Sequence, residues 1–131
     1  MIKNIIFDIG GVLAEPKSGH WFITTNFWNI LNKNLIDEEK LKISLKKYLY
    51  LQTQEPKTEK DEHKMFSNYY CNVLKDINYP NASLDIANKL ADDCVYNDDK
   101  FIFFDDVYSI LEELSKKYNL YIISNGWPSS F

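Results

Sequence analysis

The stretch that decides the fold is IIFDIGGVL, residues 5–13, near the start of the 131-residue chain. The residues that lead into it, from position 2 to position 7, are mostly β-branched or aromatic and do not alternate with polar ones. This pattern is typical of a strand that is buried on both faces of a parallel sheet. The strand runs into Asp8 and then into a Gly-Gly turn. We therefore predict a buried parallel strand with a carboxylate at its tip.

A second short apolar run, LYIISNG, occupies residues 120–126 and ends in Ser124-Asn125-Gly126. Ligands of open parallel sheets bind outside the carboxyl ends of the strands. If the two strands are neighbours, Asp8 and Ser124 face one crevice. A carboxylate there can act as a nucleophile when a cation offsets its charge, and a hydroxyl beside free N–H groups can hold an anion. Taken singly, each motif is more often only a turn or loop residue, but the occurrence of both at strand ends favours a shared site.

Between these two runs the sequence is helical in character. Four helices separated by short breaks predict a helical bundle. The first is rich in aromatic residues over positions 21–31, and the second is capped by Asp37. Thr58 and Asp61 resemble a capping box that opens the third, which ends at Tyr79-Pro80-Asn81, and Ser83 opens the fourth.

The last part of the chain returns to an α/β pattern. Asp105 is expected to cap a helix whose apolar residues at 107, 110, 111 and 114 follow helical spacing. Residues 1–15 and 99–131 thus predict one discontinuous α/β unit, with residues 16–98 inserted as a helical domain. We expect a loop over residues 15–19 to lead into that insertion.

The charge and the cysteine content of the chain exclude some classes of partner and of fold. The formal net charge of -4 and a pI near 5.1 argue against a nucleic acid or an anionic membrane as partner. The chain contains no arginine. Cys71 and Cys94 are too few for a disulfide framework, so we expect free thiols in a cytoplasmic protein. The N-terminal apolar run is too short for a signal peptide, and no stretch approaches the length of a membrane span.

The two strand-tip motifs resemble those of the haloacid dehalogenase (HAD) superfamily of hydrolases. The first motif of that family is an apolar strand followed by Asp-x-Asp-Gly-(Thr/Val)-(Leu/Val), and here residues 7–13 read FDIGGVL. Its second motif is an apolar strand ending in Ser or Thr, as in YIISNG over residues 121–126. The resemblance implies a partial Rossmann-like parallel-sheet core with a helical cap inserted after the first strand.

The resemblance also implies an activity and a set of site residues. Asp8 would be the nucleophile and a Mg²⁺ ligand, with the backbone carbonyl of Gly10 as a second ligand. Ser124, Asn125 and Gly126 would hold the phosphoryl oxygens. The cap would close over the site and exclude water. The implied function is a Mg²⁺-dependent phosphatase that acts on a small phosphorylated metabolite through an aspartyl-phosphate intermediate.

The chain departs from the family pattern at two places. The family's phosphatases carry a second Asp, the general acid, where this chain has Gly10, and Glu15 or His20 are the candidates to replace it. The family's lysine and acidic third strand would follow the second motif, where the sequence has only a few more residues. We therefore expect a chain truncated after this motif, weakly active or inactive, that self-associates or pairs with a complementing segment.

Two other functions fit the same motifs. The first is a 2-haloacid dehalogenase, which needs no metal and lacks the second Asp. The sequence SNGWP over residues 124–128 slightly favours this function. However, dehalogenase chemistry uses an arginine to hold the halide, and this chain has none. A non-catalytic, truncated HAD protein would instead act through its helical domain. Trp21, Phe22, Phe27 and Trp28 could then form a partner face, but aromatic residues at helical spacing are more often core.

Overall fold

The computed structural model describes residues 1–130 and contains both strands and helices. The strands are β1 (Asn4–Phe7), β2 (Ala14–Pro16), β3 (Phe101–Phe103) and β4 (Asn119–Ile122). The α-helices are α1 (Phe27–Ile30), α2 (Glu38–Lys47), α3 (Glu59–Asp76), α4 (Leu84–Val95) and α5 (Val107–Ser115). Three short 3₁₀ helices complete the order: η1 (Lys33–Leu35), η2 (Leu49–Gln52) and η3 (Pro128–Ser130).

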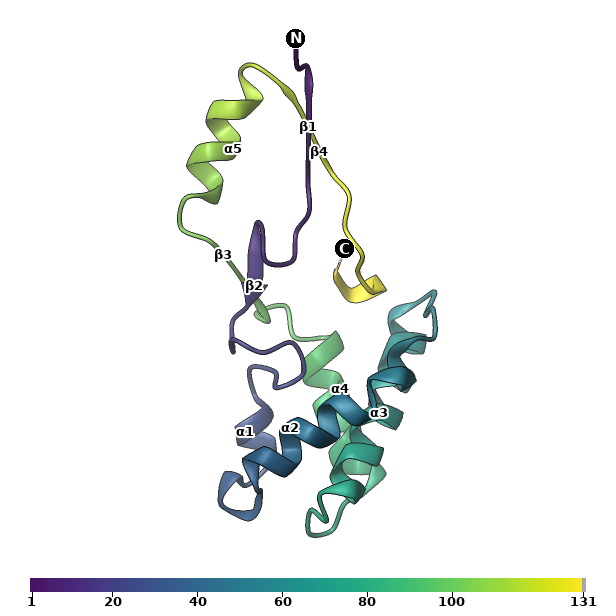
Figure 1. The fold of residues 1–131 in the computed structure, drawn as a ribbon. Coiled ribbons are helices and arrows are strands. Elements are labelled where there is room, and N and C mark those ends of the chain that lie inside the picture. Colours follow the sequence, from purple (N-terminus) through teal and green to yellow (C-terminus); the bar gives the residue numbers. More distant parts are fainter. Residues whose placement is uncertain (131) are drawn as a thin grey trace.

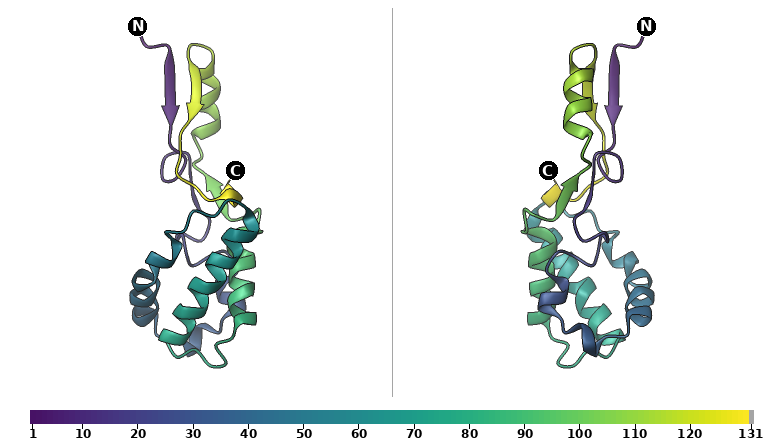
Figure 2. Two further views of the ribbon diagram at one scale, coloured as in Figure 1. Left: turned by 90° about the vertical axis from the view of Figure 1, so that its right-hand side faces the viewer. Right: turned by 90° about the vertical axis from the view of Figure 1, so that its left-hand side faces the viewer.

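The molecule is elongated and has two regions at opposite ends (Figure 1). The helical region, residues 20–98, contains α1 to α4. The strand region, residues 1–16 and 101–126, contains the four strands and α5. Figure 2 shows that the yellow segment after β4 returns from the strand region to one end of the helical region, where η3 lies.

Two small sheets organise the strand region. β1 and β4 pair in parallel, with Asn4 opposite Asn119 and Phe7 opposite Ile122. The two apolar strands are therefore neighbours in one parallel sheet, as the predicted site requires. β2 and β3 pair antiparallel, with Ala14 opposite Phe103. Residues 15–19 were expected to form a loop. This expectation is wrong for Glu15 and Pro16, which belong to β2 and pair with β3. The β2–β3 pair lies where the chain enters and leaves the helical region.

The expected burial of the first strand on both faces is wrong. β1 begins at Asn4, and the Ile6 side chain keeps 57% of its surface exposed. On β4, Tyr121 and Ile122 remain 53% and 56% exposed. Within residues 1–130, β1 and β4 pair only with each other. Parallel sheets are normally covered by helices on both faces, whereas among residues 1–130 α5 is the helix that packs beside β4 (Figure 1).

Three of the predicted helix starts are confirmed in atomic detail. The Asp37 carboxylate accepts the N–H groups of Glu39 and Lys40 at the start of α2. Thr58 and Asp61 form the reciprocal capping box of α3. Ser83 Oγ accepts the Ile86 N–H at the start of α4. These caps satisfy backbone donors that the first turn of a helix leaves unpaired.

The first predicted helix is much shorter than expected. Only Phe27–Ile30 is helical. The reason lies just upstream, where the His20 imidazole Nδ1 accepts the N–H groups of Phe22 and Ile23 at 3.1 and 3.2 Å. This side chain folds residues 20–23 into a turn, which competes with helix formation.

The start of α5 also differs from the prediction. The N-cap residue is Asp106 rather than Asp105, and its side chain makes no capping hydrogen bond. The turn is closed by the backbone instead, since the Val107 N–H donates to the Phe104 carbonyl at 3.1 Å.

The hydrophobic core lies in the helical region. α3 packs along α4, and the hydroxyls of Tyr69 and Tyr70 donate to the carbonyls of Leu45 and Phe22 at 2.8 and 2.9 Å. Burial raises the pKa of both tyrosines. The buried apolar residues of this core are Phe27, Leu31, Leu41, Leu45, Met65, Phe66, Tyr69, Tyr70, Val73, Leu74, Ala87, Leu90, Ala91 and Val95.

None of the helices in the described part of the chain combines the length and the apolar character needed to cross a bilayer.

Candidate functional site

The parallel pairing of β1 and β4 brings the two predicted strand tips into contact. Asp8 follows β1 directly and Ser124 lies just beyond β4. Ser124 Oγ donates a hydrogen bond to Asp8 Oδ1 at 2.7 Å, although 116 positions separate the two residues. The Ile9 N–H donates to the same oxygen, also at 2.7 Å. Asp8 Oδ2 accepts no hydrogen bond from residues 1–130 and is free to react or to bind a ligand.

A backbone turn holds Asp8 at the end of its strand. The Ile9 carbonyl accepts the N–H groups of Val12, Leu13 and Ala14 at 2.9 to 3.1 Å. Gly11 has φ +75°, a left-handed conformation that glycine adopts without steric cost. Gly11 therefore suits the tight turn, as the sequence suggested.

The loop after β4, which begins at Ser124, has backbone donors that are unpaired in the described part of the chain. Asn125 and Gly126 are exposed, and their N–H groups donate to no acceptor within residues 1–130. Ser124 Oγ lies at the start of the same loop. Unpaired N–H groups close to a hydroxyl attract an anion, because they present partial positive charge. The arrangement is able to hold the oxygens of a phosphoryl group.

The predicted metal ligands form an incomplete set. Within residues 1–130, no three His, Cys, Asp or Glu side chains gather closely enough to hold a metal ion. Asp8 Oδ2 and the Gly10 carbonyl are both unpaired among these residues. Mg²⁺ in phosphoryl-transfer sites is often bound by one or two carboxylates, with waters and substrate phosphate as the other ligands. A carboxylate and a backbone carbonyl are oxygen ligands of the type that Mg²⁺ accepts, so Asp8 and Gly10 would be the residues to hold it.

Trp21 covers Gly10, and sequence reasoning missed this contact. A Cβ atom built on Gly10 would lie 3.3 Å from Trp21 Cη2. A longer side chain at position 10 would therefore collide with the indole unless the indole moved. Trp21 was expected to be helical and more often core, but it lies outside α1 and is 47% exposed. No local periodicity indicates this placement, because it depends on how the helical region meets the turn after β1.

Neither candidate replacement for the missing general acid reaches Asp8. Glu15 lies on β2 and is exposed. His20 uses Nδ1 to accept two backbone N–H groups, and burial followed by the charge of Lys42 lowers its pKa. Within residues 1–130, neither side chain hydrogen-bonds to Asp8 or Ser124.

A cavity of about 220 Å³ lies beside the Ser124 loop. Its walls are largely apolar, and its polar groups come from the loop after β4 and from the Gly10 turn. The residues that line it are Ile9, Gly10, Leu13, Ala14, Trp21, Phe101, Phe103, Ile122, Ser124, Asn125, Gly126 and Ser130.

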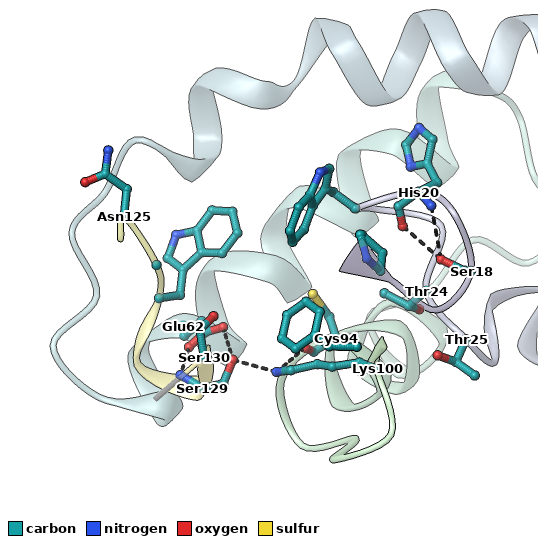
Figure 3. Close-up of a pocket in the computed structure, with 15 residues that line it drawn as sticks. Ser18, His20, Thr24, Thr25, Glu62, Cys94, Lys100, Asn125, Ser129 and Ser130 are labelled. Carbon is teal, nitrogen blue, oxygen red and sulfur yellow. Dashed lines mark hydrogen bonds between the residues drawn. The ribbon is translucent and has the colours of Figure 1, made fainter. Parts of the chain in front are cut away.

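A second, smaller cavity shares Trp21, Phe101 and the loop after β4 with the first, and Glu62 and Cys94 of the helical region also line it (Figure 3). Glu62 is almost fully buried there, with 1% of its surface exposed. Its two carboxylate oxygens accept the Ser129 N–H at 2.8 Å and the Ser129 hydroxyl at 2.6 Å. These contacts fasten the segment after the Ser124 loop to α3.

Lys100 completes the polar cluster in this second cavity. Its ammonium group donates to the carbonyls of Cys94 and Val95 at the end of α4 and to Ser129 Oγ. All three of its donors are thereby used, and its charge is placed where a helix C-terminus favours a cation. Burial raises the pKa of the neighbouring Cys94 thiol to about 12, so this thiol is protonated at neutral pH.

Sequence reasoning missed Glu62, Lys100 and Ser129. A weak signal was present, because Glu62 lies three and four positions before Met65 and Phe66 on the apolar stripe of α3. Cys71 and Cys94 were expected to be free thiols, and both are.

Comparisons of this chain with family models, with curated proteins and with solved structures found no match.

Proposed function

We propose that this protein is a hydrolase of the HAD superfamily and that it acts as a Mg²⁺-dependent phosphatase on a small phosphorylated compound. The observation that carries the proposal is the 2.7 Å hydrogen bond between Ser124 Oγ and Asp8 Oδ1 across the parallel pair β1–β4. In this proposal the strand region is a partial Rossmann-like core and the helical region is its cap. The side chain of Trp21, which comes from the helical region and lies against Gly10, supports that division.

In the proposed reaction, Asp8 Oδ2 attacks the phosphorus atom. Oδ1 is held by the Ser124 hydroxyl and the Ile9 N–H, which orient the carboxylate. When the phosphate binds, the single proton of the Ser124 hydroxyl turns from Asp8 Oδ1 to a phosphoryl oxygen. Together with the N–H groups of Asn125 and Gly126 it stabilises the charge there. Mg²⁺, bound by Asp8 and the Gly10 carbonyl, would supply neutralisation of the charge that Asp8 and the phosphate share.

We expect slow turnover. Within residues 1–130 no lysine or histidine forms an ion pair with Asp8. No carboxylic acid lies at position 10 to protonate a leaving group, and general acid catalysis contributes about 10²–10⁴-fold. Formation of the phosphoryl-Asp8 adduct is therefore a better quantity to measure than steady-state turnover.

The test combines phosphate release in the presence of Mg²⁺ with the intact mass of the acid-quenched protein. We expect one phosphoryl group on Asp8, and neither adduct nor phosphate release with Asp8→Asn. Ser124→Ala should reduce the rate by about 10²–10³-fold, the usual cost of one donor to a developing oxyanion. Asp98→Asn is the matched control, since Asp98 is exposed and its side chain makes no hydrogen bond or ion pair within residues 1–130.

Two results would contradict the proposal. Metal-independent halide release from a 2-haloacid, abolished by Asp8→Asn, would favour dehalogenase chemistry. Absence of both the adduct and phosphate release would favour a non-catalytic role for the helical region.

A further inference from the structure

The apolar cavity beside Ser124 has the size and the walls to hold one aromatic ring. Its volume is about 220 Å³, and a cavity of about 150 Å³ lined by apolar side chains binds benzene. Trp21 and Phe101 form a tilted aromatic pair in its wall, with ring centroids 5.9 Å apart. Phe103 also lines it, and Trp21 and Phe103 are 47% and 48% exposed. These rings thus present free aromatic surface to a ligand.

The lining of this cavity is selective because the residues among 1–130 that form it include no charged side chain. A second anionic group on a ligand would find no cation there. A sugar or polyol would leave most of its hydroxyls without partners, since the polar groups are confined to the Gly10 turn, the loop after β4 and Ser130. The part of a substrate that occupies this cavity is therefore neutral and apolar.

Within residues 1–130, the same site provides no acidic side chain to protonate a leaving group. Trp21 Cη2 lies 3.3 Å from the position that a Cβ atom on Gly10 would take, so the indole occupies the space of a side chain there. The Ser124 hydroxyl donates to Asp8. A leaving group that departs without protonation must be a weak base, as a phenolate is and an alkoxide is not.

We infer that the substrate is a small aryl phosphomonoester, a conclusion that rests on the proposed function and names its substrate class. The aryl ring lies in the cavity between Trp21, Phe101 and Phe103, and its phosphate meets Asp8 and the Ser124 loop. Asp8 Oδ2 forms a bond to phosphorus as the bond from phosphorus to the aryl oxygen breaks, and the bonding pair leaves with the phenolate. Water then attacks the aspartyl phosphate, which restores the Asp8 carboxylate, releases inorganic phosphate and returns a proton to solvent.

The first experiment measures binding without turnover. Phenylphosphonate and methylphosphonate carry the same anionic head, and only the first carries a ring. We expect phenylphosphonate to bind about 10-fold more tightly, the scale of an aromatic contact. Trp21→Ala should abolish that difference and Trp21→Phe should preserve part of it. Trp28→Phe, a change in the helical region, should leave it intact.

The second experiment compares leaving groups of similar size. We expect rates to fall from p-nitrophenyl phosphate to phenyl phosphate, and benzyl phosphate to be about 10²–10⁴-fold slower than phenyl phosphate, because its alkoxide must leave unprotonated. All release should depend on Asp8.

The outcomes separate the two proposals. If neither phosphonate binds and no ester is hydrolysed, the proposed function fails and the substrate class fails with it. If both phosphonates bind equally, or if benzyl phosphate is hydrolysed as fast as phenyl phosphate, the phosphatase remains and only the aryl specificity is overturned.

Discussion

The helical and strand regions of this protein are packed to very different degrees. The fourteen buried residues of the continuous core all belong to α1–α4 and the segments between them. In the strand region only Leu13, Ala14 and Val107 are buried among the apolar residues. Burial of apolar surface is the dominant favourable term in folding. We therefore expect most of the free energy of unfolding to come from the helical region, whereas Asp8 and Ser124 of the candidate site lie in the strand region.

The largest effect should come from removing a core ring. Phe66 is fully buried and its ring contacts those of Tyr69, Tyr70 and Trp127. We expect Phe66→Ala to lower the free energy of unfolding by about 3–5 kcal/mol. Ile6→Ala on β1 should change it by less than about 0.5 kcal/mol, since that side chain is 57% exposed. Chemical denaturation measures both, and a large cost for Ile6→Ala would mean that β1 is covered in solution.

An intermediate effect should follow from breaking the contact that fastens the segment after the Ser124 loop to α3. Glu62→Ala leaves the Ser129 N–H and hydroxyl without acceptors in a largely enclosed place. We expect a loss of about 1–3 kcal/mol, together with faster hydrogen exchange of the Ser129 and Ser130 amides, which donate to Glu62 and to the Trp127 carbonyl. Glu113→Ala, on an exposed face of α5, is the matched control. Unchanged exchange in Glu62→Ala would show that the Ser124 loop is held by β4 alone.

The smallest effect concerns pH and His20, at the start of the helical region. Burial lowers the pKa of His20 below its ordinary 6.5, so the unfolded chain takes up this proton first as pH falls. The contribution of neutral His20 to the free energy of unfolding is therefore fully present above about pH 6.5, and it declines as the pH falls toward the lowered pKa. Protonation also removes the lone pair that accepts the N–H groups of Phe22 and Ile23.

Denaturation midpoints at pH 7.5 and 5.5 test this expectation. The His20→Asn variant should show a weaker dependence on pH, because its side chain carries no proton in that range. An equal dependence in both proteins would assign the effect to other groups.

Local signals in the sequence predicted part of this structure well. Asp37, Thr58 with Asp61, and Ser83 were predicted as helix starts, because a cap depends on residues only two or three positions away. The span of α1 was predicted poorly, since the His20 side chain diverts the backbone before the helix. The pairing of Glu15 and Pro16 with β3 was missed as well, because a pairing partner 85 or more positions away leaves no local periodicity.

The sequence by itself determined which residues stand at the strand tips. Asp8 and Ser124 each end a short apolar run, and strand propensity followed by a glycine turn is a local property. Only the tertiary structure decided what surrounds them. The register of β1 against β4 brings Ser124 Oγ to Asp8, and the approach of the helical region places Trp21 over Gly10. Both contacts depend on how the chain folds in three dimensions. The surroundings of Asp8 and Gly10 therefore could not be read from the spacing of residues along the sequence.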